Sequence, residues 1–364
     1  MPTALYEVRR IVSLLAMGRP LERGMCSQWT SRHWEIVLSE NLGPWFHKCL
    51  CDRVDVGINS DVLARLRRDY RSSAIANLYR EVALRNLLAV FNSRCIATIL
   101  LKGAYLGRFV YKDPSLRPML DIDILVSEDH FEQAGQELER LKYKLVFEPK
   151  EYEESLLKLP KVYGLSAPVT QFVDLHRGIQ SMDYYRFPSS ILWGDAVQRE
   201  FCGHRVFYLS AELNFIHLVI HALNHRAGLR DWLDLIALIR STNLDWERLI
   251  VLARSLGAMR PLFWAFDELE RIWGAPPPEH VSAALALYVP NWIEDRVIRS
   301  RYCYLWRLFA RVARLGGWRP RFRYVATKLA MPSDEWGLER ISSNISRLKS
   351  KIRLFLHFWK RPTG

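Results

Sequence analysis

The spacing of apolar residues predicts that the chain begins and ends in helices. Before residue 96, apolar positions recur every three or four residues, as in the segment 63–87, which is the spacing of one helix face. Gly43-Pro44 and the segment 55–60 interrupt this pattern and are typical of breaks between helices. From Ser210 onward the helical spacing returns. We therefore expect helical regions on both sides of a different central part.

Two compact apolar runs in the central part predict buried strands. Residues 96–101 are rich in β-branched side chains and end at Lys102-Gly103. Residues 119–126 form the second run, Met-Leu-Asp-Ile-Asp-Ile-Leu-Val. Ser127 is a good N-cap for a helix over 128–143, whose first turn is acidic. Strands and helices thus alternate in this part of the chain.

Further strands are expected over 144–147 and within 169–179. Together these elements predict an α+β fold, with a small mixed-sheet core flanked by helices. The boundaries that we expect are an N-terminal helical region over 1–95, an α/β core over 96–209, and a C-terminal helical region over 210–364.

Two carboxylates in the second apolar run are the first candidates for chemistry. Side chains alternate along a strand, so Asp121 and Asp123 share one face, while Ile122 and Ile124 point into a core. Both carboxylates are ionised near neutral pH, and they repel each other unless a cation neutralises them. Mg²⁺, or Mn²⁺ in its place, is the expected cation because it prefers hard oxygen ligands and substrate phosphates.

Asp174 is the candidate for a third carboxylate. It shares a strand face with Phe172 and His176. If this strand lies beside that of Asp121, the three aspartates form a set that can hold two metal ions for in-line phosphoryl displacement. A D-x-D pair alone is a weak signal, since surface strands often carry such pairs without function. The apolar surroundings of this pair make its charges costly and favour a functional role.

Three residues near these aspartates are candidates for binding phosphate. Gly103 follows a predicted buried strand and precedes a predicted helix, a geometry that brings backbone N–H groups to a phosphate. Lys102 adds a cation, and Arg117, four residues before Asp121, can bind phosphate through two parallel hydrogen bonds.

The segment LLKGAYLGRFVYKDPSLRPMLDIDILV, residues 100–126, resembles the signature of an uncharacterised nucleotidyltransferase family of the DNA polymerase β-like superfamily. VDLH at 173–176 is similar to the strand that carries the third carboxylate of that family, and the segment 215–238 is similar to its histidine-rich helix. The resemblance covers most of residues 30–260 and becomes thin after 260.

The resemblance implies that Asp121, Asp123 and Asp174 are catalytic and bind metal, with Asp174 as a ligand or as the base for the acceptor proton. Nucleotide-binding roles are expected for a second set of residues: Lys102, Gly103, Arg117, His176 and His225. The sequence departs from the family pattern at Ala104, where a serine is common, and at Arg177, where an aromatic residue is common.

Three histidines, His217, His221 and His225, lie four residues apart on one predicted helix. This spacing can ligate zinc, although packing or hydrogen bonding is the more frequent role of such histidines. A third interpretation places His221 or His225 at the cleft, in contact with the nucleotide or the acceptor. Asp234 is expected either to orient one of these histidines or to lie at the surface.

The net charge of +13 is concentrated at the C-terminal end. Residues 301–364 hold 15 Lys and Arg against 3 Asp and Glu, which accounts for +12. This basic end, interleaved with aromatic residues, is expected either to bind an anionic partner or to be a solvated helical face. The six cysteines do not complete a zinc pattern and favour buried, reduced thiols. Without a transmembrane-length apolar segment, we expect a cytoplasmic protein.

These features lead to an expected Mg²⁺-dependent transfer of a nucleotidyl group from an NTP, with ATP as the expected donor, to an acceptor hydroxyl or phosphate. The acceptor is left open between a peptide, a small molecule in natural-product tailoring, and tRNA. One alternative is a non-catalytic nucleotide-binding module, which Ala104 favours and the retained aspartates disfavour. Another is kinase-like phosphoryl transfer with the same carboxylates.

Overall fold

The computed structural model describes residues 3–149, 160–166, 169–179, 187–224, 227–289, 318–319 and 321–322. Its α-helices are α1 (Ala4–Ala16), α2 (Ser31–Ser39), α3 (Gly43–Leu50), α4 (Ser60–Ser93), α5 (Lys102–Tyr105), α6 (Phe131–Arg140), α8 (Ser189–Gly194), α9 (Ala211–Asn224), α10 (Leu229–Ser241), α11 (Trp246–Leu256), α12 (Met259–Trp273) and α13 (Glu279–Leu285). Its strands are β1 (Thr98–Leu100), β2 (Asp121–Val126), β3 (Lys144–Phe147), β4 (Lys161–Leu165), β5 (Gln171–His176), β6 (Val197–Phe201) and β7 (His204–Tyr208).

Within the described residues, the strands form one seven-stranded sheet in the order β3-β4-β5-β2-β1-β7-β6. The sheet is mixed, because β2 runs parallel to β5 and antiparallel to β1, while β1 runs parallel to β7. The central strands β1 and β2 are almost entirely buried, as their apolar composition predicts. The expected α+β fold with a mixed sheet is thus confirmed.

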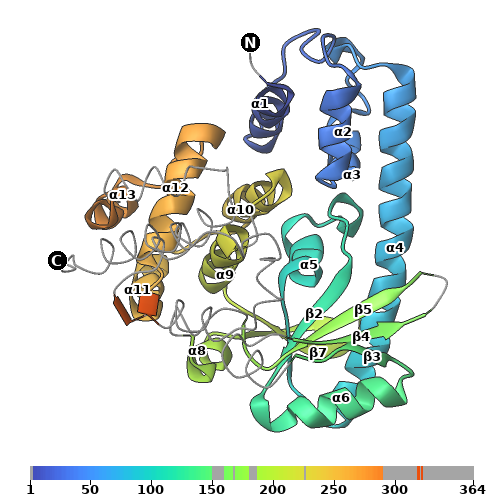
Figure 1. The fold of residues 1–364 in the computed structure, drawn as a ribbon, viewed down its shortest axis with the longest axis vertical. Coiled ribbons are helices and arrows are strands. Elements are labelled where there is room, and N and C mark those ends of the chain that lie inside the picture. The colour runs from blue at the N-terminus through green and yellow to red at the C-terminus, as the bar shows by residue number, and fades with distance from the viewer. Residues whose placement is uncertain are drawn as a thin grey trace, which may run out of the picture.

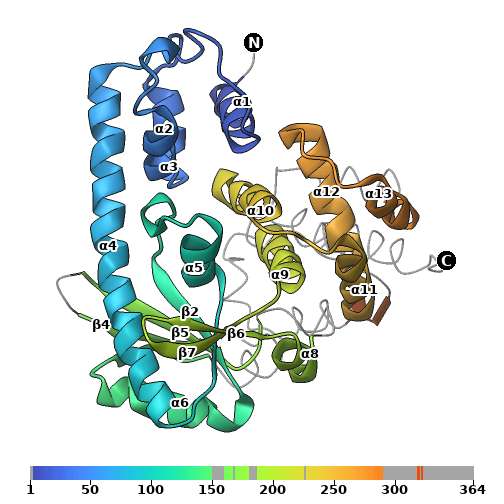
Figure 2. The same cartoon turned by 180° about the vertical axis from the view of Figure 1, so that it is seen from behind.

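The helices cover the sheet from two sides (Figures 1 and 2). Helix α6 lies on one side, and α5, α9 and α10 lie on the other. The long helix α4 passes along the molecule from α2 and α3 to the sheet, where it packs against β7 and α6. Helix α1 packs against α10 and α12, so helices that precede the sheet strands in the sequence touch helices that follow them. Buried apolar side chains from all these elements form one connected core.

The helical breaks predicted from the sequence are observed. Gly43 and Pro44 open α3, with the proline in the first turn, where its missing N–H costs nothing. Helix α4 begins after Asn59, whose side chain accepts a hydrogen bond from the Asp61 amide. At the other end of the chain, α11 stops at Gly257, which adopts the left-handed conformation that glycine favours.

Two details of the predicted core differ from the structure. Ser127 does not cap a helix through its side chain; its hydroxyl lies 2.9 Å from Nδ1 of His130, and a short 3-10 segment (Glu128–His130) precedes α6. The helix also ends at Arg140 instead of residue 143, because Lys142 has a positive φ of 70°. Strands β4, β6 and β7 were absent from the elements that we predicted from the sequence.

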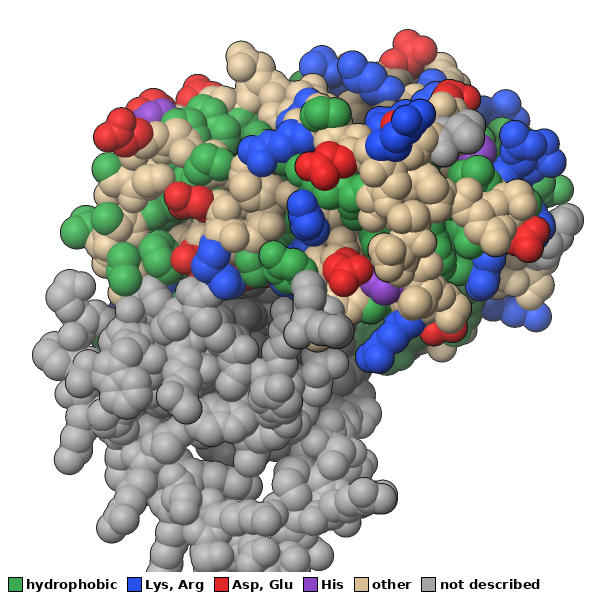
Figure 3. Space-filling model, turned by 90° about the horizontal axis from the view of Figure 1, so that it is seen from above, with side chains coloured by type: hydrophobic (Ala, Val, Ile, Leu, Met, Phe, Trp, Pro, Cys, Tyr) green, Lys and Arg blue, Asp and Glu red, His purple; other side chains and the backbone are tan. Residues whose placement is uncertain are grey.

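No helix among the described residues is long and apolar enough to cross a membrane. On the face shown in Figure 3, basic, acidic and apolar side chains are interspersed over the described part. Of the strongly basic segment 301–364, the structure describes only Trp318, Arg319, Arg321 and Phe322, so the predicted anion-binding end lies almost wholly outside the described residues.

Candidate active site

Two neighbouring strands carry the three predicted carboxylates. Because β2 and β5 pair in parallel register, Asp123 lies directly opposite Asp174. Asp121 is two residues earlier on β2, on the same face as Asp123, and lies opposite Phe172. The structure therefore brings together the aspartates from residues 121–123 and 174, which are far apart in the sequence.

Asp123 is the most enclosed of the three, with 3% of its surface exposed. Its Oδ1 accepts hydrogen bonds from Nζ of Lys102 at 2.7 Å and from Nε2 of His176 at 3.1 Å. Burial alone would raise the pKa of Asp123, but the Lys102 ammonium and the hydrogen bond from His176 hold it well below its usual range. Burial lowers the pKa of His176, so its ring is neutral near pH 7 and donates as an imidazole.

Asp174 and Asp121 have the opposite electrostatic character. Burial, and then the charges of Asp123 and Asp121, raise the pKa of Asp174 to about 7. The pKa of Asp121 is raised by burial and by Asp123. Donor atoms of Asp123, Asp174 and His176 lie within 4.8 Å of one another, close enough to share one metal ion. Asp121 is outside this compact group, but it lines the same cleft as Asp123.

The Lys102-Gly103 step begins α5 directly above β1. Lys102 has a positive φ of 40°, which is an uncommon conformation for a residue with a side chain. Its ammonium group lies against the carboxylate of Asp123. A Cβ on Gly103 would lie 2.8 Å from Nη1 of Arg117 and 2.9 Å from Cγ of Met119. Glycine is therefore needed here for close packing, and this packing brings Arg117 to the start of α5.

Arg117 is anchored by a buried carboxylate from the C-terminal helices. Its Nε and Nη2 donate to Asp234 of α10 at 2.9–3.1 Å, and the Tyr111 hydroxyl donates to the same carboxylate at 2.8 Å. Asp234 is 2% exposed, so the expectation of a surface position is wrong, and its observed partners are Arg117 and Tyr111 rather than a histidine. The Nη1 atom of Arg117 remains directed at Gly103.

The predicted histidines are only partly brought to the site. His217 is buried, and burial, followed by the charge of Lys102, lowers its pKa to about 3, so it is neutral. His221 lines the cleft that is described next. His225 lies outside the described residues. His176 is enclosed behind Asp123, and its expected contact with a nucleotide stays a prediction.

A cleft opens over Asp121 and Asp123, with strand β2 and α5 on one side and α9 and α10 on the other. Its lining residues are Lys102, Gly103, Arg117, Pro118, Met119, Leu120, Asp121, Asp123, Leu218, His221, Arg230, Asp231 and Asp234. Most of the residues predicted to bind metal or phosphate thus face one cavity. Leu120 is 69% exposed beside Asp121, which leaves an apolar contact at the rim.

Sequence reasoning missed two residues of α4 that shape this region. The Asn77 side chain donates to the carbonyls of Pro114 and Arg117 at 2.6 and 3.0 Å, and fixes the loop that leads to β2. Arg80, three residues later, lines a small cavity with Gly103 and Met119. Both are polar residues on the buried side of a helical pattern, which was the one available signal.

No curated protein matches the chain. Among solved structures, the antibiotic-resistance factor ANT(2'')-Ia is 14% identical, with a TM-score of 0.37 over 53% of this chain and 98% of that chain. A nucleotidyltransferase-like antigen of Paracoccidioides brasiliensis is 15% identical, with a TM-score of 0.33 over 54% of this chain and 92% of that chain.

A protein-family model matches a long part of the chain. The family model described as an uncharacterised nucleotidyltransferase matches residues 29–274, which is more than half of the chain. The match includes β1, β2 and β5 with all three aspartates, and it agrees with the resemblance seen in the sequence. The chain therefore belongs to this uncharacterised nucleotidyltransferase family and is a transferase of nucleotidyl groups.

Proposed function

We propose that the protein transfers a nucleotidyl group from an NTP, with ATP as the expected donor, to an acceptor hydroxyl or phosphate, in a reaction that requires Mg²⁺ or Mn²⁺. The observation that carries this proposal is that Asp121, Asp123 and Asp174 lie on adjacent strands, and that Asp121 and Asp123 line a cleft together with Lys102 and Gly103. A carboxylate set beside cationic and backbone donors is what a metal–triphosphate complex needs.

The residues present fit a divalent cation. The three carboxylates lie on adjacent strands, and burial, followed by the charges of Asp123 and Asp121, raises the pKa of Asp174. Asp123 and Asp174, with Asp121 beside them, would hold the ion through oxygen atoms, and His176 would orient Asp123 from behind. When bound, the ion would neutralise charge on the transferring phosphoryl group.

The side chains of the protein have distinct parts in the proposed reaction. The acceptor oxygen forms a bond to the α-phosphorus, the bond to the bridging oxygen breaks, and pyrophosphate leaves with its electron pair. We assign to Asp174 either ligation or removal of the acceptor proton, as a pKa near neutrality allows. Lys102 and Nη1 of Arg117 are assigned to the triphosphate.

The acceptor would approach the wall that α9 and α10 contribute. His221, Leu218 and Arg230 line this wall, so it offers both polar and apolar contacts. A peptide, a small molecule and tRNA are the acceptor classes that we propose, and a salt titration separates them. Affinity for RNA should fall steeply as salt rises because phosphate contacts release counterions, whereas affinity for a neutral small molecule should change little.

The reaction type is tested with ATP labelled either at the α- or at the γ-phosphorus. With Mg²⁺ and a mixture of candidate acceptors, the α-label should pass to an acceptor and the γ-label should appear in pyrophosphate. Transfer of the γ-label to the acceptor would instead establish phosphoryl transfer and overturn the proposal. Binding of Mg²⁺-ATP without turnover of either label would identify a binding module.

Metal binding should strengthen as pH rises from about 6 to about 8. The Asp174 carboxyl, with a pKa of about 7, must lose its proton before it ligates a cation. Because folding raises the pKa of Asp174, the free energy of unfolding of the metal-free protein decreases as pH rises from about 4, the pKa of this carboxyl in the unfolded chain, through about 7. Thermal midpoints with and without Mn²⁺ should therefore differ more at pH 8 than at pH 6.

An Asp174→Asn variant is the control for this pH dependence, since it cannot titrate at this position. Its Mn²⁺-induced shift should be small and should vary much less between the two pH values. Equal Mn²⁺-induced shifts at pH 6 and pH 8 in the wild-type protein would show that Asp174 is not part of the cation site.

A further inference from the structure

Two buried arginines, Arg117 and Arg80, lie near Gly103 and Met119, and they differ in how their charge is compensated. Arg117 is clamped by the buried carboxylate of Asp234. Arg80 of α4 is 7% exposed, and within the described part of the chain its guanidinium makes one hydrogen bond, from Nη1 to Oδ1 of Asn77 at a long 3.4 Å. Its Nε is enclosed without a hydrogen-bond partner among the described residues, and no carboxylate of that part forms an ion pair with it.

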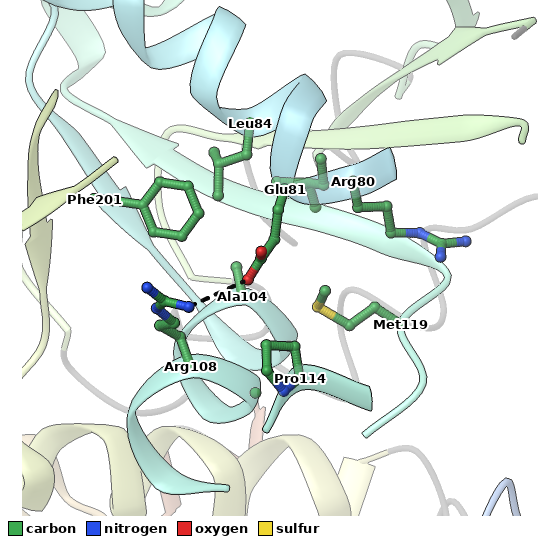
Figure 4. A pocket seen from close by; sticks show the side chains of 11 residues that line it. Arg80, Glu81, Leu84, Ala104, Arg108, Pro114, Met119 and Phe201 are labelled. Carbon is green, nitrogen blue, oxygen red and sulfur yellow. Dashed lines mark ion pairs between the residues drawn. The ribbon is translucent and has the colours of Figure 1, made fainter. Parts of the chain in front are cut away.

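The position of Arg80 connects it to the catalytic cleft. The cavity that Arg80 lines is bounded by Gly103 and Met119, and these same two residues also line the cleft over the carboxylates. In Figure 4 the Arg80 side chain leaves α4 beside Glu81 and extends away from the Glu81–Arg108 ion pair, towards the side on which Met119 lies. Asp121 is near enough for its charge to act on the Arg80 guanidinium.

The environment of Arg80 is costly for the unliganded protein. Burial lowers the pKa of Arg80, and the charge of Asp121 offsets only part of this effect. A buried guanidinium is ordinarily satisfied by an anion, because its desolvation is otherwise uncompensated. An oxyanion that enters from the cleft would supply the missing acceptors, and the planar guanidinium is well suited to phosphate oxygens.

We propose that Arg80 binds the polyphosphate of the NTP, beside Asp121 and the start of α5. This inference rests on the proposed function and adds a substrate-binding residue from the N-terminal helical region to it. The cavity of Arg80 is lined by Gly103, Ala104 and Gly107, on the side of the cleft assigned to the triphosphate. Leu218, His221 and Arg230, which line the acceptor wall, do not line that cavity.

The test measures binding of inorganic triphosphate, with Mg²⁺ present, to the full chain by calorimetry. Arg80→Gln should weaken the affinity roughly tenfold to a hundredfold, because the loss of one charge-assisted hydrogen bond usually raises the dissociation constant by such a factor. Arg80→Lys keeps the charge but not the planar fork and should be intermediate. The matched control is Arg85→Gln, an exposed arginine on the same helix, which should bind as the wild-type protein does.

A second measurement separates ligand binding from a structural role. Without ligand, Arg80→Gln should unfold at the same temperature as the wild-type protein or at a higher one, because it removes an uncompensated buried charge. A lowered midpoint together with undiminished triphosphate affinity would make Arg80 a structural residue and overturn the inference.

The outcomes also separate this inference from the proposed function. If the wild-type protein binds neither Mg²⁺-ATP nor triphosphate, the proposed function fails. If the wild-type protein binds both and Arg80→Gln binds them equally well, the proposed function stands and the role of Arg80 is refuted.

Discussion

An Asp123→Asn variant is expected to turn over NTP roughly a hundredfold to a thousandfold more slowly than the wild-type protein, the usual cost of removing one group that stabilises transition-state charge. Asparagine keeps the shape of the side chain but removes the charge that Lys102 and His176 hold in place. The cation then loses its most enclosed carboxylate. The measurement is kcat at saturating NTP and Mg²⁺.

Asp129→Asn is the matched control, because Asp129 is an exposed carboxylate shortly after β2 and should leave kcat unchanged. Circular dichroism at the assay temperature establishes that both variants are folded. An Asp123→Asn protein that is folded and retains the wild-type kcat would remove Asp123 from the catalytic set.

An Asp234→Ala variant is expected to lower the free energy of unfolding by about 3–5 kcal/mol, the cost of breaking a buried ion pair by removal of one partner. The change leaves the Arg117 guanidinium and the Tyr111 hydroxyl buried without their acceptor. It also releases α10 from the loop that leads to β2. Urea denaturation, monitored by tryptophan fluorescence, measures the loss.

A double variant, Arg117→Met with Asp234→Leu, sharpens this second prediction. Removing both charges leaves no unpaired ion, so the double variant should be more stable than Asp234→Ala. It should nevertheless bind triphosphate less tightly, since it lacks Nη1 of Arg117 at Gly103. Equal stability of the single and double variants would mean that the buried Arg117 guanidinium costs little stability when it is unpaired.

The elements that contain the carboxylates could be predicted because their patterns are local. The run around Asp121 and Asp123 is apolar except for these two aspartates, and its residues 121–126 form β2. Asp123 and Asp174 meet only because their two strands are neighbours in the sheet, and the alternation of side chains within one strand does not determine its neighbours. The structure shows that β2 and β5 are neighbours.

The strands missed from the sequence lacked such local signals. Four of the five residues of β6 are exposed, because it is an edge strand, so its apolar alternation is weak. The turn to β7 consists of Cys202 and Gly203, both with positive φ, where Asn-Gly would have been the recognisable form. The partners of Arg117 and Arg80 could not be predicted for another reason. They depend on packing between elements that are far apart in the sequence.

The position of β1 has a consequence for the order in which the chain acquires its structure. This strand leads into Lys102, yet its two sheet neighbours come from residues 124–126 and 207–208. A ribosome must therefore have released more than half of the polypeptide before β1 can be flanked on both sides. Because closing so long a loop costs entropy before any pairing rewards it, the phosphate side of the cleft is expected to form late in folding.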